Sequence, residues 1–79
     1  MPGVRVQRLM RLIDESRPFQ HGSDCHASAR KLEMAYHEIC LLAETSLMDL
    51  NADMILTFCM QACAHGDEEK ASHVFQVGR

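Results

Sequence analysis

The chain has 79 residues, of which 47% are hydrophobic, and its formal charge at neutral pH is −3. A chain of this length forms one domain, whose core rarely supplies more than about 3–5 kcal/mol of stability. Residues 1–20 carry four arginines and two acidic residues, whereas residues 21–79 carry four basic and nine acidic residues. A mostly acidic chain with a mildly basic beginning does not attract nucleic acid strongly as a whole.

Targeting and membrane segments are not evident in the sequence. The most apolar window, residues 54–64, is too short to span a bilayer. Arginines are spread through residues 1–20, where a secretory signal would have an apolar run. We therefore expect a cytoplasmic protein with no membrane contact, in which the four cysteines are reduced thiols.

The composition predicts an all-α domain, because Leu, Met and Ala are strong helix formers and the prolines and glycines lie near helix edges. Residues 4–16 form the first predicted helix, an amphipathic one in which the apolar residues recur at helical spacing. These residues are Val6, Leu9, Met10 and Ile13. Pro18 disfavours helical geometry in the preceding residue, so residues 17–22 are predicted to be a linker.

Residues 23–77 are predicted to form a helical hairpin with arms at about 24–48 and 52–77. Apolar residues of the first arm cluster on one broad face, from Leu32 to Leu50, which we interpret as its core side. Asn51 is a good N-cap for the second arm. At Gly66 the sequence leaves two alternatives: the chain bends there, or the helix continues at a cost of about 1 kcal/mol relative to alanine.

Two surplus apolar surfaces predict self-association. Met34, Leu41 and Met48 repeat every seven residues nearly opposite the core side of the first arm. The second arm, which begins around Met54 and Phe58, is apolar on most sides, and such a helix has to be buried on most sides. We therefore predict a homodimeric helix bundle in which these five residues form the dimer or partner interface. In the alternative, the stripe packs under the N-terminal helix within one chain.

Two pairs of soft ligands stand one helical turn apart, His37 with Cys40 and Cys59 with Cys63. If the arms pivot near Leu50, these four side chains come to similar levels, and such a set suits tetrahedral zinc or a redox-responsive switch. Buried cysteine also behaves as a small hydrophobic residue. We favour the interpretation of these cysteines as small hydrophobic core residues, and we predict no cofactor.

Arg5, Arg8 and Arg11 recur every three residues along the first predicted helix. They could contact phosphates, which makes a nucleic-acid-binding regulator an alternative function. The simpler interpretation is a solvated helix face, because the chain is acidic and no aromatic residues are interleaved with these arginines.

The sequence contains no glycine-rich phosphate loop, no paired carboxylates in a plausible cleft and no Ser-His-Asp arrangement. We therefore predict a non-enzymatic protein. The predicted function is a small protein–protein interaction module, a regulator or inhibitor that binds a partner protein through an exposed apolar helix face. The nucleic-acid regulator and the metal or redox switch are the alternatives.

Overall fold

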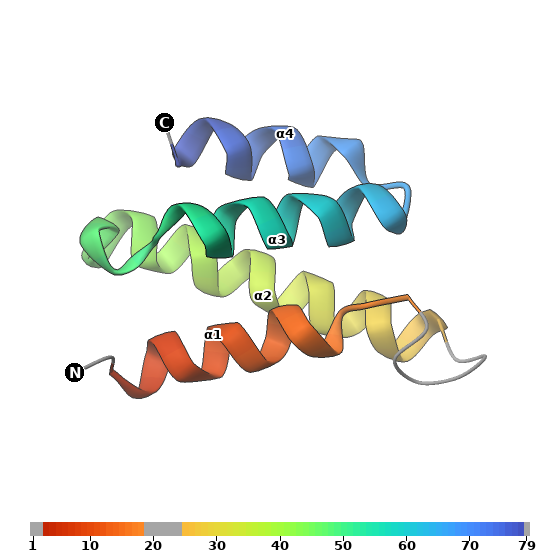
Figure 1. Cartoon of the computed structure of the whole chain (residues 1–79), viewed down its shortest axis with the longest axis horizontal. Helices are drawn as coiled ribbons and strands as arrows, with labels where there is room; N and C mark the ends of the chain where they lie inside the picture. Colours follow the sequence, from red (N-terminus) through yellow and green to blue (C-terminus); the bar gives the residue numbers. More distant parts are fainter. Residues whose placement is uncertain (1–2, 19–24, 79) are drawn as a thin grey trace.

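A computed structural model describes residues 3–18 and 25–78 (Figure 1). In these residues the chain forms four α-helices and a short 3-10 helix, and no strand. The helices are α1 (Val4–Glu15), α2 (Cys25–Thr45), α3 (Ala52–Ala64) and α4 (Glu68–Val77), with η1 (Leu47–Asp49) between α2 and α3. The all-α prediction is confirmed. Residues 19–22 of the predicted linker and residues 23–24 of the predicted hairpin lie outside the described residues.

The amphipathic N-terminal helix is confirmed within one residue of its predicted end. Its buried side chains are Val6, Leu9, Leu12 and Ile13. After Glu15 the chain leaves the helix, and the Ser16 hydroxyl donates a hydrogen bond of 2.6 Å to the carbonyl oxygen of Ile13. The backbone N–H of Ser16 donates to the same carbonyl at 3.2 Å, so Ser16 bonds it twice at the C-terminal end of the helix.

Helix α2 ends at Thr45, three residues before the predicted end at Met48. The Thr45 hydroxyl donates to the carbonyl oxygen of Leu41 at 2.8 Å, and the Ser46 hydroxyl donates to the carboxylate of Asp49 at 2.7 Å. Short polar side chains that bond locally compete with helix continuation. As a result Met48 lies in η1, and the seven-residue stripe on α2 consists of Met34 and Leu41 alone.

Helix α3 begins and ends at recognisable signals. The Asn51 side chain accepts a hydrogen bond from the backbone N–H of Met54, which confirms the predicted N-cap. At the other end the N–H of Gly66 donates to the carbonyl of Cys63 and the N–H of Asp67 to that of Ala62. This is a Schellman ending, in which the residue after the cap takes a left-handed conformation.

Gly66 has a φ of +77°, so the chain turns back there and α4 starts at Glu68. Of the two alternatives left open at Gly66, the structure shows the bend, and the second arm predicted over residues 52–77 is divided into α3 and α4. A long two-armed hairpin is replaced by two shorter ones.

The two hairpins, α1–α2 and α3–α4, lie side by side. Helix α1 contacts α3, and α2 contacts both α3 and α4. Figure 1 shows that α1 and α3 run in the same direction and that α2 and α4 run in the opposite one. Consecutive helix pairs of α-solenoids stack in this way. We call the contact between the two hairpins the seam.

The core lies within the hairpins and along the seam. Its largest fully buried apolar side chains are Phe58, Leu9, Ile39, Leu42 and Val74. Where α1 and α3 end, Nε2 of His65 donates a hydrogen bond of 2.6 Å to the carbonyl oxygen of Ser16. This hydrogen bond ties the end of α3 to the end of α1, so polar and apolar contacts both hold the seam together.

Candidate interaction surfaces

The five residues predicted to form an interface divide into two groups. Met54 and Phe58 are buried, and the Phe58 ring stacks on Tyr36 with 6.3 Å between the ring centroids. These two side chains fill the core of the chain, so the prediction that they form an interface is wrong. The apolar character of α3 is largely accounted for by its three helix neighbours, which the single predicted hairpin partner could not supply.

Met34 and Leu41 keep 40% and 41% of their surface exposed, and Met48 keeps 97%. Helix α1 packs on α2 beside the stripe, where the carboxylate of Glu15 lies 3.4 Å from Nζ of Lys31. The packing of α1 on α2 leaves about two-fifths of the surface of Met34 and of Leu41 in solvent, so α1 does not enclose the stripe as the alternative prediction required.

Three further large apolar side chains are exposed on the second hairpin. Leu56 and Met60 lie on α3, and Phe75 lies on α4, where it keeps 50% of its surface exposed. The sequence showed α3 to be apolar on most sides, but it did not show which of its side chains the fold would leave uncovered.

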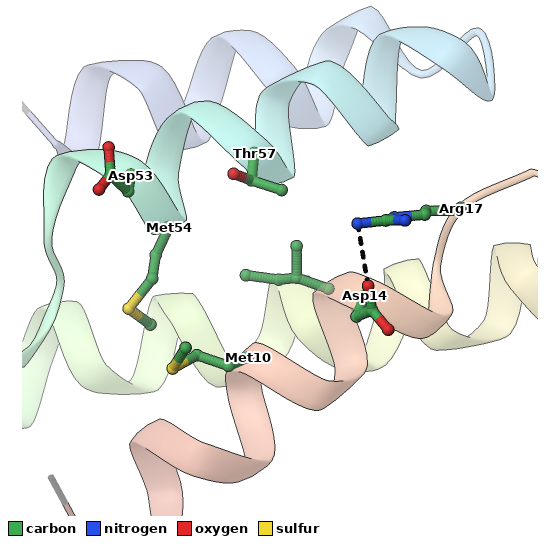
Figure 2. A pocket seen from close by; sticks show the side chains of 7 residues that line it. Met10, Asp14, Arg17, Asp53, Met54 and Thr57 are labelled. Atoms are coloured by element: carbon green, nitrogen blue, oxygen red, sulfur yellow. Dashed lines mark ion pairs between the residues drawn. The ribbon is translucent and has the colours of Figure 1, made fainter.

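A groove of about 360 Å³ opens between α1 and α3. Met10, Ile13 and Met54 line its apolar part, and Figure 2 shows the Met10 and Met54 side chains extending toward each other from the two helices. An ion pair of 3.0 Å between Asp14 and Arg17 stands on the α1 side. The residues that line the groove come from two segments, 10–17 and 53–57, which are more than 30 positions apart in the sequence, so periodicity within one helix could not predict the groove.

The predicted ligand set of His37, Cys40, Cys59 and Cys63 is not brought together. Among the described residues no group of three or more His, Cys, Asp or Glu side chains could hold a metal ion. Nε2 of His37 lies 3.3 Å from the Glu33 carboxylate, and the Cys59 thiol donates to the carbonyl oxygen of Ala71. Burial raises the pKa of the Cys59 thiol, which favours the protonated form over the thiolate that binds metals.

A polar cluster joins α2 to α4 across the seam. Nζ of Lys70 lies 3.1 Å from the Glu33 carboxylate and 2.9 Å from that of Asp67, and 5.4 Å from the centre of the Tyr36 ring. Hydrogen bonds to Asp67 and Glu33 raise the pKa of Lys70 to about 12, and the bonds from Lys70 lower the pKa of Asp67. Oη of Tyr36 lies 2.5 Å from Nδ1 of His73. The cluster fixes the register of α4 on α2.

Arg5, Arg8 and Arg11 are exposed on α1, as the predicted solvated face requires. Nε of Arg8 lies 3.9 Å from the Glu38 carboxylate on α2, so one of the three arginines takes part in holding the first hairpin together. Their exposure is compatible with either interpretation of this edge.

Comparison of the chain with protein families, with curated proteins and with solved structures found no match. In the described residues no helix has both the length and the apolar character needed to cross a bilayer.

Proposed function

We propose that this protein is a small interaction module that binds another protein through an apolar face on α2. The face consists of Met34 and Leu41, and Met48 adds an exposed methionine in the turn that follows. The observation that supports this proposal is the exposure of these side chains on a long helix whose opposite side is fully covered by the core.

The chemistry of the face suits protein recognition. Met34 and Leu41 lie two helical turns apart, about 10 Å along the axis, a spacing that the apolar side of a partner helix can match. Methionine side chains are flexible and polarizable, so they adapt to partner surfaces of different shape. A regulator or inhibitor of this kind acts by occupying its partner and needs no catalytic group.

Selection from a displayed library of amphipathic helical peptides tests the proposal. Peptides are selected on the wild-type chain, and their binding is then measured on a Met34→Glu/Leu41→Glu variant and on Val4→Glu. Val4 is an exposed apolar residue in the first turn of α1, where a carboxylate is well tolerated, so it is the matched control.

We expect the selected peptides to bind the wild type and Val4→Glu equally, and to bind the double variant at least about tenfold more weakly, a change of ~1.4 kcal/mol. Far-UV circular dichroism establishes that each variant keeps its helices. Equal binding to all three proteins, or no enrichment on the wild type, would contradict a recognition face on α2.

A further inference from the structure

Exposed apolar side chains of α2, α3 and α4 point away from the seam, whereas Met10 of α1, which is also exposed, lines the groove between α1 and α3. Tyr36 and His73 meet across the seam. Residues two apart on a helix point about 200° from each other. Met34, two residues before Tyr36, and Phe75, two residues after His73, therefore point to opposite ends of the two-hairpin stack.

The same geometry holds for α1 and α3. Met10 and Met54 line the groove where these helices meet. Arg8, two residues before Met10, therefore points away from α3, and Leu56, two residues after Met54, points away from α1. Each hairpin thus has an outer face.

Residues three, four or seven apart share one side of a helix and complete each face. We call the outer face of the first hairpin the head face; its residues are Arg5, Arg8, Met34 and Leu41. We call that of the second hairpin the tail face; its residues are Leu56, Met60, Glu68 and Phe75.

We propose that copies of this chain stack head to tail, with the tail face of one copy covering the head face of the next. The inference rests on the proposed function, because the head face contains Met34 and Leu41, and it names a second copy of the chain as the partner. Stacking continues the arrangement that the two hairpins already have inside one chain, as helix pairs do in solenoids.

The register of the seam brings complementary side chains together at such a junction. Residues of α2 and α4 that face each other are 37 positions apart, both for Tyr36 with His73 and for Glu33 with Lys70. In the same register, Phe75 of one copy comes level with Glu38 of the next, midway between Met34 and Leu41. The exposed ring then lies between the two exposed apolar side chains, at the level where the half-buried Glu38 side chain pairs with Arg8.

Charge favours the same pairing. Glu68 on the tail face is exposed and makes no ion pair with the described residues. In the register of the seam it comes level with Lys31 of the next copy, whose Nζ lies 3.4 Å from the Glu15 carboxylate. Arg5 and Arg8, nearer the other end of the first hairpin, add further positive charge to the head face. Two head faces would instead bring arginines together, so the charges favour a junction of head with tail.

Such a junction is heterologous, because it joins two different faces, and it leaves one free face at each end of the assembly. Assembly is therefore open-ended unless the copies close into a circle. Blocking one face at a time tests this property. Met34→Glu/Leu41→Glu blocks the head face, and Leu56→Glu/Phe75→Glu blocks the tail face. Sedimentation velocity of the full-length protein under reducing conditions measures the wild type, each variant alone and their equimolar mixture.

We expect the wild type to form a concentration-dependent series of species and each variant alone to stay monomeric. The mixture should form a single species of twice the 8.9 kDa chain mass, because one intact head meets one intact tail and growth stops there. A tail-blocked variant that dimerises alone would overturn the proposal in favour of a symmetric junction between head faces. Monomers in every sample would overturn self-association altogether.

Glu68→Lys provides a variant that leaves the core untouched, because residue 68 is exposed; a cation in the first turn of α4 costs the helix under about 1 kcal/mol, so circular dichroism accompanies the measurement. We expect it to raise the concentration at which the wild-type series forms by about tenfold, a difference that salt reduces. An unchanged concentration would contradict the proposed register.

If the selected peptides bind α2 while all samples stay monomeric, the interaction function stands and stacking fails. If stacking occurs without peptide binding, recognition of other proteins fails and stacking stands.

Discussion

The seam between the hairpins is built from residues similar to those of the head and tail faces, which we call together the end faces. The seam and the end faces differ in what covers them. Phe58 on α3 is fully buried and stacked on Tyr36, whereas Phe75 on α4 keeps half of its surface in solvent. Both are phenylalanines on helices of the second hairpin. The difference lies in the number of helices around each position, which follows from the side-by-side stacking of two hairpins.

Replacing each phenylalanine by alanine is the strongest way to test this difference. Phe58→Ala should cost about 3–5 kcal/mol because it opens a cavity in the seam. A loss of this size equals the stability expected of so small a core, so we expect the cooperative unfolding transition to disappear. Urea titration followed by far-UV circular dichroism at low protein concentration measures it.

Phe75→Ala is the matched control at an end face, where the same atoms are removed from a half-exposed site. We expect it to cost less than about 1 kcal/mol in dilute solution. Similar losses in the two variants would show that the second hairpin buries both rings, and would remove the distinction between seam and end face.

Gly66→Ala tests whether the bend creates the seam. Apart from residue 66 and its two chain neighbours, no heavy atom lies within 4 Å of the added methyl group, so its cost comes from the φ of +77°. A left-handed conformation costs an ordinary residue about 1–2 kcal/mol, and we expect the midpoint of urea unfolding to fall accordingly. Gly66→Asn should recover part of this loss, because asparagine tolerates the conformation better. Equal stability of the alanine variant would mean that the helix can run straight through.

Local signals accounted for the helices themselves. The period of Val6, Leu9 and Ile13 located α1, and Asn51 located the start of α3, because each signal lies within a few residues of the structure that it predicts. At Gly66 the sequence left a bend and a straight helix as two open alternatives. The Schellman hydrogen bonds at this glycine, and the packing of α4 against α3, are the interactions that favour the bend.

The surfaces could not be predicted in the same way, because they depend on contacts between distant residues. The groove brings Met10 to Met54, and the seam brings Tyr36 to His73. Periodicity shows that a helix has two apolar sides but not which of them another helix will cover. For this reason Met34 and Phe58 looked alike as interface candidates, although one is on the surface and the other in the core.

Asp67→Asn gives the smallest expected effect and tests the polar cluster of the seam. Lys70 lowers the pKa of Asp67 in the folded chain. The ionised carboxylate therefore stabilises the fold at pH values above 3.8, the ordinary pKa of aspartic acid. This contribution disappears as the pH falls through the lowered folded value. Asparagine keeps the N-cap but cannot titrate, so the variant should lose less stability than the wild type on acidification, by under about 1 kcal/mol.

Urea titrations between neutral pH and the acid limb measure this difference. Glu44→Gln, which removes an exposed carboxylate that makes no ion pair with the described residues, is the matched control and should keep the wild-type slope. Parallel acid limbs for wild type and Asp67→Asn would show that the bonds between Asp67 and Lys70 do not stabilise the folded chain. The register of α4 on α2 would then depend on Tyr36, His73 and the buried apolar contacts.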